Sequence, residues 1–129
     1  MKNLNYSDLS IKLTKDISTN TKKENGIYFT PQNTIISNLE FLKSYFNNIN
    51  NILEPSCGSC EFINAINSLY PHKNITGIEY NSNIYNSIKH LSNKYVEIIN
   101  HNFITYSSKK KYDLIIGNPP FYVMKKNEV

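Results

Sequence analysis

The stretch 52-ILEPSCGSCEF-62 changes from an extended pattern to a helical one within a few residues. The apolar run 52–54 stops at Pro55, a turn of small residues follows, and apolar residues then recur with a helical period until Pro71. This order predicts a strand, a tight turn and a helix. The apolar face of the predicted helix consists of Phe62, Ile63, Ile66, Leu69 and Tyr70.

The same alternation continues toward the C-terminus. The segments that we interpret as further strands are 74–80, 95–100 and 112–117. Between the first two of them, Ile84, Ile88 and Leu91 mark another helix, with Asn81 in position to cap it. Strands that alternate with helices are typical of crossover connections, so the sequence predicts an α/β fold with a parallel sheet and flanking helices.

Upstream of the quoted stretch, Thr30 and Pro31 resemble a helix start, with a capping hydroxyl before a proline at the first helical position. An amphipathic helix is then predicted, which the Asn-rich segment 47–51 breaks. Residues 1–25 are polar without a clear period, and we expect a loose arm or a short helix there. The apolar residues of the amphipathic helix are Ile35, Leu39, Leu42 and Phe46.

Length and composition limit the class of protein. A chain of 129 residues with 40% hydrophobic content is large enough for one small domain with a core. The net charge of +4 is compatible with a polyanionic partner. A polar N-terminus excludes a signal peptide, no apolar run reaches membrane-span length, and two cysteines without a secretory context indicate a reducing environment. We therefore expect an intracellular, cytoplasmic protein that does not enter membranes.

The chemically unusual residues fall at the ends of the four predicted strands. They are the segments 54–58, 102–103 and 118–121, together with Glu79. In an open parallel sheet, ligands bind beyond the carboxyl ends of the strands. The sequence thus predicts one binding site at that edge of the sheet.

The turn after the first strand lacks the G-x-G-x-x-G pattern and the P-loop lysine, which disfavours a diphosphate ligand. Glu54 adds a negative charge that would attract an amino group, although an ordinary strand–helix turn is the alternative interpretation. Cys57 and Cys60 form a C-x-x-C pair, which is compatible with a redox site. A zinc site would need two more ligands, and the three histidines are scattered, so packing of small residues is the favoured interpretation.

The next two strand ends carry groups that can bind a nucleoside. Glu79 lies 21 residues after Gly58, the separation at which an acidic residue binds ribose hydroxyls in nucleotide-binding sheets. The Asn102 amide can bind an adenine edge, and the Phe103 ring can cover its face. The alternatives are a solvated loop carboxylate at Glu79 and a loop amide beside a core aromatic at 102–103.

The fourth strand end is stiffened by two prolines, because each fixes its own backbone and restricts the preceding residue. Asn118 and nearby backbone carbonyls are therefore held as acceptors with few competing donors. Two fixed acceptors suit the NH2 group of a planar ring, because accepting both hydrogens opposes delocalisation of the nitrogen lone pair. Phe121 could stack on that ring, although a strand-terminating turn with a buried phenylalanine would have the same sequence.

These segments resemble the S-adenosylmethionine-dependent amino-methyltransferases, and among them the N6-adenine DNA methyltransferases. 118-NPPF-121 is similar to their catalytic motif, and 53-LEPSCGSCEF-62 to their cofactor loop. 77-GIEYN-81 and 102-NF-103 match the next two cofactor segments, and 26-GIYFTP-31 is similar to the segment that precedes the cofactor loop. The resemblance implies a Rossmann-like methyltransferase fold, S-adenosylmethionine as cofactor and adenine-containing DNA as substrate.

The resemblance also implies roles for individual residues. Thr30 and Glu54 would contact the methionine part of the cofactor, and Phe121 would stack on the target base. Cys60 stands where such enzymes often have glycine, a position that a small residue can fill. Asn102 stands where they usually have aspartate, and the lost charge implies weaker cofactor binding. The implied cofactor-binding set is Thr30, Glu54, Pro55, Cys57, Gly58, Glu79, Asn102 and Phe103. The implied catalytic set is Asn118, Pro119, Pro120 and Phe121.

The chain ends eight residues after Phe121, whereas the sheet of such enzymes has three further strands and a target-recognition region follows. We therefore expect a polar arm over 1–25 and an incomplete catalytic core over 26–129, truncated after the fourth strand. That core would bind the cofactor weakly and need a second chain or a C-terminal region to methylate DNA. The alternatives are a methyltransferase acting on RNA or on protein glutamine, and a non-catalytic cofactor-binding module.

Overall fold

The computed structural model describes residues 7–16 and 29–119. Its sheet has four strands in the order β3-β2-β1-β4, and every neighbouring pair is parallel. This arrangement confirms the α/β fold with a parallel sheet. The strands are β1 (Asn51–Glu54), β2 (Asn74–Glu79), β3 (Val96–Asn100) and β4 (Leu114–Ile115).

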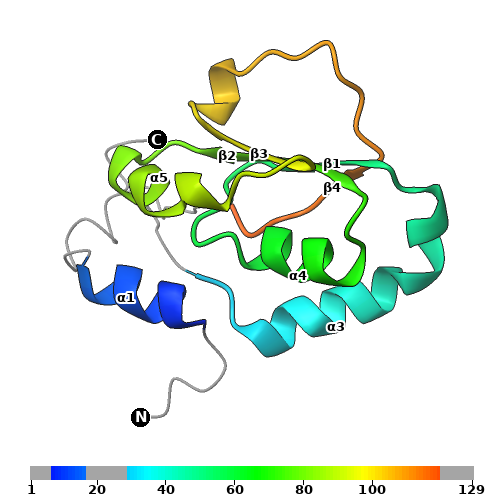
Figure 1. The fold of residues 1–129 in the computed structure, drawn as a ribbon, viewed down its shortest axis with the longest axis horizontal. Helices are drawn as coiled ribbons and strands as arrows, with labels where there is room; N and C mark the ends of the chain where they lie inside the picture. Colours follow the sequence, from blue (N-terminus) through cyan, green and yellow to red (C-terminus); the bar gives the residue numbers. More distant parts are fainter. Residues whose placement is uncertain (1–6, 17–28, 120–129) are drawn as a thin grey trace, which may run out of the picture.

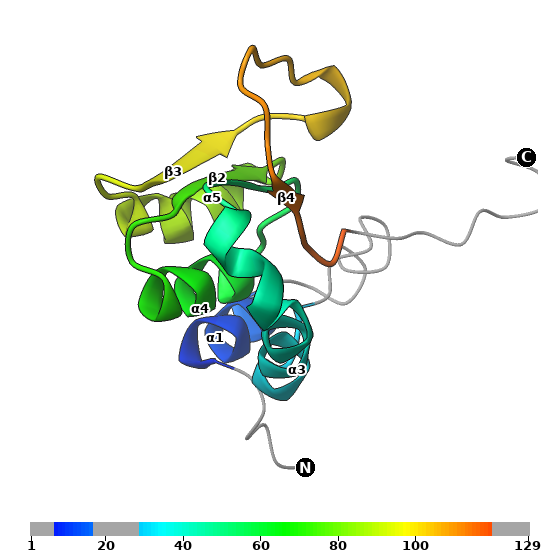
Figure 2. The same ribbon diagram turned by 90° about the vertical axis from the view of Figure 1, so that its right-hand side faces the viewer.

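The helices gather on one side of this sheet. Figures 1 and 2 show α1, α3, α4 and α5 below it, whereas the segment between β3 and β4 loops over the other side. The α-helices are α1 (Asp8–Asp16), α3 (Gln32–Leu42), α4 (Glu61–Leu69) and α5 (Ser82–Ile88). Three short 3-10 helices follow α3, α5 and β3, namely η1 (Lys43–Asn48), η2 (Lys89–Leu91) and η3 (Phe103–Thr105).

The main core lies between the helices and the sheet. Because side chains alternate across a strand, Ile52 enters this core, whereas its neighbour Leu53 is buried outside the core cluster. Leu13 of α1 also enters the core, so the N-terminal segment contributes a packed helix. Other buried members are Ile35, Leu39, Ile63, Ile66, Ile75, Ile84, Ile88, Val96 and Ile98.

The short strand β4 is held against β1 at both ends. The Asp113 backbone N–H donates to the Asn51 carbonyl at 2.7 Å, and Ile116 N–H donates to the Leu53 carbonyl at 3.0 Å. The Asp113 carboxylate also accepts hydrogen bonds from the N–H groups of Asn50 and Asn51, both at 2.9 Å. These bonds fix the backbone that leads into the predicted catalytic segment.

Two local predictions were wrong. Thr30 does not cap α3, because Pro31 has an extended backbone (φ −61°, ψ 146°) and is itself the N-cap, with no side-chain hydrogen bond. Leu69 was placed on the buried face of α4, yet 61% of its surface is exposed. It is the last residue of α4, and the buried residues of this helix lie in its first two turns.

The prediction for α5 was right for its cap and for Ile84 and Ile88, whereas Leu91 lies in the 3-10 helix η2 that follows. The Asn81 side chain accepts a hydrogen bond from Ile84 N–H at 3.0 Å and caps the helix, with Ile84 and Ile88 buried. Within the described residues, no helix combines the length and apolar character needed to cross a membrane.

Candidate functional site

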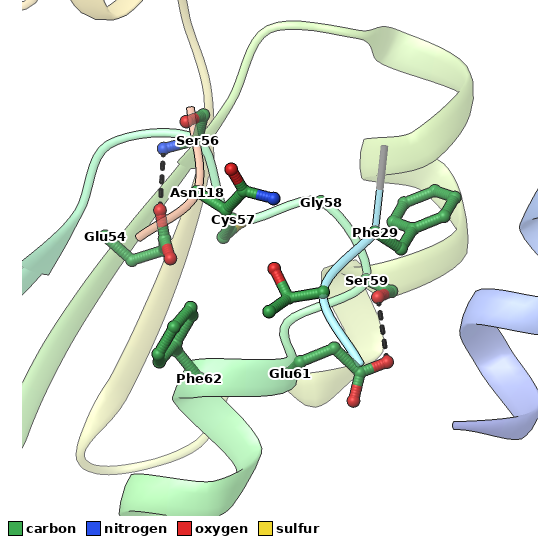
Figure 3. A pocket seen from close by; sticks show the side chains of 10 residues that line it. Phe29, Glu54, Ser56, Cys57, Gly58, Ser59, Glu61, Phe62 and Asn118 are labelled. Carbon is green, nitrogen blue, oxygen red and sulfur yellow. Dashed lines mark hydrogen bonds between the residues drawn. The ribbon is translucent and has the colours of Figure 1, made fainter. Parts of the chain in front are cut away.

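A pocket lies at the carboxyl ends of β1 and β4, between the turn 55–60 and the residues that precede α3 (Figure 3). It encloses about 260 Å³, counting the part that is open to solvent. The lining residues are Phe29, Thr30, Glu54, Ser56, Cys57, Gly58, Ser59, Glu61, Phe62 and Asn118. The structure thus brings together Thr30, Glu54, Cys57, Gly58 and Asn118 of the predicted set.

Asn118 is exposed, and its side chain points into this pocket rather than into the core (Figure 3). It follows Gly117, where a Cβ atom would collide with the carboxylate of Glu54. The absence of a side chain at Gly117 therefore allows the end of β1 and the segment after β4 to approach closely.

Glu54 is the last residue of β1 and only 2% of its surface is exposed. Its Oε1 accepts a hydrogen bond from the Ser56 backbone N–H at 3.0 Å. Burial raises the pKa of its carboxyl from the ordinary 4.5 to about 8, against the opposing effect of that hydrogen bond, and nearby Glu79 adds to the rise. Glu54 is therefore protonated at neutral pH, and a cation placed beside it would favour the ionised form.

The turn after β1 contains two residues in the left-handed region, Gly58 with φ +53° and Cys60 with φ +64°. A non-glycine residue at such an angle is strained. Glycine adopts such an angle without strain, so this backbone is compatible with the glycine that the resemblance implies at the position of Cys60. Cys57 N–H donates to the Ile78 carbonyl at 2.9 Å, which ties the turn to β2.

The two cysteines are free and buried. The Cys57 thiol is hydrogen-bonded to Cys60 and is buried, and both effects raise its pKa. Cys57 is therefore not a thiolate at neutral pH. Reactive cysteines have lowered pKa values, and packing of small residues is the interpretation that the structure favours. Among residues 7–16 and 29–119, no group of three or more His, Cys, Asp or Glu side chains is arranged to hold a metal ion.

Glu79 ends β2 and is buried, so it is not the solvated loop carboxylate considered as an alternative. Its Oε1 accepts from Gly58 N–H at 2.9 Å, and its Oε2 accepts from Asn81 N–H at 2.8 Å. Burial raises the pKa of its carboxyl, although its backbone hydrogen bonds oppose the rise. Glu79 thus joins the turn after β1 to the start of α5. Its predicted contact with ribose hydroxyls stays a prediction.

Asn102 and Phe103 lie beyond the end of β3 and are not among the lining residues of the pocket. The Asn102 side chain accepts from Ile104 N–H at 3.0 Å and caps η3, while Phe103 is 44% exposed. Phe103 is therefore not a core aromatic. The Asn100 amide donates to the carbonyls of Glu79 and Tyr80, at 2.8 and 3.2 Å, and so links the ends of β2 and β3.

The remaining residues of the predicted site either do not line the pocket or lie outside the described residues. Pro55 is half-buried and does not line the pocket, and Pro119 is exposed after Asn118. Pro120 and Phe121 lie outside the described residues.

Sequence reasoning missed five of the lining residues, namely Phe29, Ser56, Ser59, Glu61 and Phe62. Ser56 is notable because its hydroxyl oxygen is buried and has no hydrogen-bond partner among the described residues. Buried hydroxyls usually have partners, so Ser56 is an exception in the wall of the pocket. Its position directly after Glu54-Pro55 was the available signal.

Comparison with known proteins identifies the fold and the family. Residues 5–129 match the family described as Eco57I restriction-modification methylase. The type II methyltransferase M.CvrRI of Paramecium bursaria Chlorella virus XZ-6E is 34% identical over 117 residues, which cover 91% of this chain and 30% of that protein. The modification methylase CviBIII of Paramecium bursaria Chlorella virus NC1A is 31% identical over 121 residues, covering 92% of this chain and 32% of that protein.

The chain thus spans about a third of the length of these curated relatives. Among solved structures, CalS10, an amino pentose methyltransferase from Micromonospora echinaspora with bound SAM, aligns with a TM-score of 0.60 at 11% identity. That alignment covers 88% of this chain and 42% of CalS10, and it shows a shared Rossmann-like methyltransferase fold. The match over nearly the whole chain shows that this protein belongs to the Eco57I restriction-modification methylase family.

Proposed function

We propose that this chain is the S-adenosylmethionine-binding part of a DNA methyltransferase that modifies the N6 amino group of adenine. One observation carries the proposal. The Asn118 amide, the Glu54 carboxyl and the Gly58 turn meet in a single pocket at the carboxyl ends of β1 and β4. Acceptors for an amino group and a site for a cationic cofactor are therefore adjacent.

The described residues of the pocket fit the cofactor chemically. Two carboxyl groups line it, from Glu54 and Glu61, and no lysine is among its described lining residues. Such a pocket suits a ligand with positive charge, because a cation beside Glu54 would lower the raised pKa of its carboxyl and favour the ionised form. S-adenosylmethionine supplies a methyl group on a positively charged sulfur beside an ammonium group. Gly58 and Ser56 also line this pocket, beside Glu54.

Asn118 acts on the substrate amino group. Its carboxamide oxygen and the backbone carbonyl of Pro119 accept the two N–H hydrogens, which opposes delocalisation of the nitrogen lone pair into the ring. The hydrogen bonds at Asp113 and Ile116 fix the strand that carries these acceptors, so little reorganisation accompanies the reaction. Glu54, in contact with Gly117, holds the cofactor end of the site in alignment with them.

An adenine inside a duplex cannot reach this pocket, so it has to be flipped out, at a cost of a few kcal/mol. Stacking on Phe121 would recover roughly 1–3 kcal/mol of that cost. The similarity to a type II methyltransferase and to a modification methylase supports a DNA substrate. Selection of the target sequence would require a second chain or a C-terminal region.

Calorimetry with S-adenosylmethionine tests the cofactor assignment. We expect weak binding by wild type, weaker binding by Glu54→Gln and unchanged binding by Asn118→Ala, because Asn118 acts on the substrate. Glu40→Gln, at an exposed position of α3, is the matched control for Glu54. A wild-type chain that does not bind at millimolar cofactor would contradict the proposal.

S-adenosylmethionine with a labelled methyl group can identify the substrate that receives this group. Single-turnover incubation with adenine-containing DNA, RNA and glutamine-containing peptides, followed by product analysis, separates the candidate substrates. We expect no sustained turnover on duplex DNA, slow transfer to unpaired adenine and no transfer by Asn118→Ala. Transfer to RNA or glutamine alone would replace DNA as the substrate. Cofactor binding without transfer to any substrate would instead favour a non-catalytic module.

A further inference from the structure

A buried polar cluster joins the N-terminal segment to the cofactor turn. Its members are Ser7 and Ser10 from the α1 region, and Ser59 and Glu61 from the turn and the first residue of α4. The hydroxyl oxygens of Ser10 and Ser59 are 2.6 Å apart, and Ser59 donates to Glu61 Oε1 at 3.0 Å. Ser7 and Ser10 are also hydrogen-bonded to that oxygen.

This cluster lies on both sides of the most strained residue of the turn. Cys60 has φ +64° and is the N-cap of α4, yet it makes no side-chain cap hydrogen bond. Its two neighbours, Ser59 and Glu61, are the residues that α1 contacts. Strained conformations persist where the surrounding structure over-determines them. The Cys60 backbone N–H donates to the Cys57 carbonyl at 2.7 Å, and the contacts from α1 add to this constraint on both sides of Cys60.

The cluster also depends on α1 for its own stability. Glu61 is buried, and a buried carboxylate without hydrogen-bond donors is costly. Ser10 is buried with it, while Leu13, one helical turn further on, anchors α1 in the core. Removal of the α1 hydroxyls would leave Glu61 with fewer donors and free it to move, together with the turn.

We propose that α1 acts through Ser10 and Glu61 to hold the turn 56–60 in the conformation that binds the cofactor. No described residue of α1 lines the pocket, so its influence reaches the ligand through Ser59 and Glu61, which do. Ser10 is thus a positioning residue that acts through Glu61, which itself lines the pocket, and the N-terminal helix is a functional part of the cofactor site. This inference rests on the proposed cofactor site, whereas its structural part concerns the turn alone.

Two measurements on Ser10→Ala test the proposal. Calorimetry well below the unfolding temperature should show a Kd for S-adenosylmethionine that is raised about fivefold. A change of this size corresponds to the contribution of one hydrogen bond. Amide hydrogen exchange without cofactor should show faster exchange at Gly58 and Cys60. Thr14→Ala, at an exposed position of α1, is the matched control and should change neither quantity.

A purely structural role for α1 predicts a different result. Ser10→Ala would then lower the unfolding temperature while leaving the cofactor Kd and the exchange at the turn unchanged, which would overturn the proposal. A double-mutant cycle with Glu61→Gln should show coupling in the Kd, because the two residues share one hydrogen bond. Additive effects in the cycle would also count against the proposal.

Two further outcomes remain decisive. If Ser10→Ala fails to fold, Ser7→Ala removes a half-buried member of the same cluster and is expected to produce the same changes in smaller measure. If wild type does not bind S-adenosylmethionine, the proposed function fails. The exchange experiment still decides whether α1 holds the turn.

Discussion

The raised pKa of Glu54 gives the protein a stability that depends on pH. The folded protein holds the proton of this carboxyl up to about pH 8, whereas an unfolded chain releases it near 4.5. Stability should therefore be unaffected below pH 4.5 and fall as pH rises from there toward 8. Glu79, whose pKa is also raised, acts in the same direction.

Urea unfolding of Glu54→Gln at about pH 5, 7 and 9 checks this prediction. The variant should lose less stability than wild type over that range, because it has no carboxyl to ionise at this position. Glu40→Gln should behave as wild type. An identical pH dependence in wild type and Glu54→Gln would show that Glu54 does not retain its proton.

Gly117 is the residue that allows Glu54 to occupy its position. Gly117→Ala should displace the Glu54 carboxylate and destabilise the fold by roughly 1–3 kcal/mol, the usual range for overpacking. It should also weaken cofactor binding. Asn118→Ala, which adds no atoms beside Glu54, is the control and should retain the wild-type Kd. Calorimetry and chemical denaturation measure the two effects.

Because the backbone at Cys60 is left-handed, the stabilities of variants at this position should follow an unusual order. Cys60→Gly should stay within about 1 kcal/mol of wild type, because relief of strain offsets the lost thiol and the greater freedom of the unfolded chain. Cys60→Val should be much less stable, since a β-branched side chain is poorly tolerated at positive φ. Denaturation midpoints test this order, and a valine variant as stable as the glycine variant would contradict it.

At the scale of elements, Asn81 connects a strand end to a helix. Its side chain caps α5, and removal of such a cap costs roughly 1 kcal/mol. We therefore expect Asn81→Ala to lower the free energy of unfolding by about that amount, while Asn83→Ala, exposed within the same helix, changes it little. Equal effects of the two substitutions in thermal unfolding would argue against the cap.

The elements were largely predictable from the sequence because each has a strong local signal. The period of the apolar residues located the helices and strands, and chain topology then placed Glu54 and Asn118 at one edge of the sheet. The start of α3 was misplaced because Pro31 is compatible with both the first helical turn and the cap. The extent of pairing at β4 was also unpredictable, since it depends on bonds to β1 more than fifty residues away.

Part of the site was hidden from sequence reasoning for a similar reason. Ser59 and Glu61 look like ordinary residues of a turn and a helix start, and their importance depends on how α1 packs against them. The orphaned hydroxyl of Ser56 depends on the folded backbone around it. Such properties arise from contacts between distant segments, and no local pattern encodes them.

At the scale of the whole molecule, the described sheet presents an apolar edge. β4 pairs with β1 and with no other described strand, and Ile115, opposite Leu53, is 61% exposed. Exposed edge strands promote association. Ile115→Lys should therefore reduce self-association of the chain in sedimentation experiments at high concentration, whereas Glu97→Lys on β3 should not. Unchanged association of the Ile115 variant would exclude this edge.

The close approach of Gly117 to Glu54 has a consequence for how the two reactants meet. The two parts of the site, at Glu54 and at Asn118, meet where Gly117 lies against the Glu54 carboxylate, and this contact forms when the chain folds. In the proposed function, this contact would hold the methyl donor and the nitrogen that receives the methyl group in alignment, so a substitution on either side of the contact would also disturb the other side.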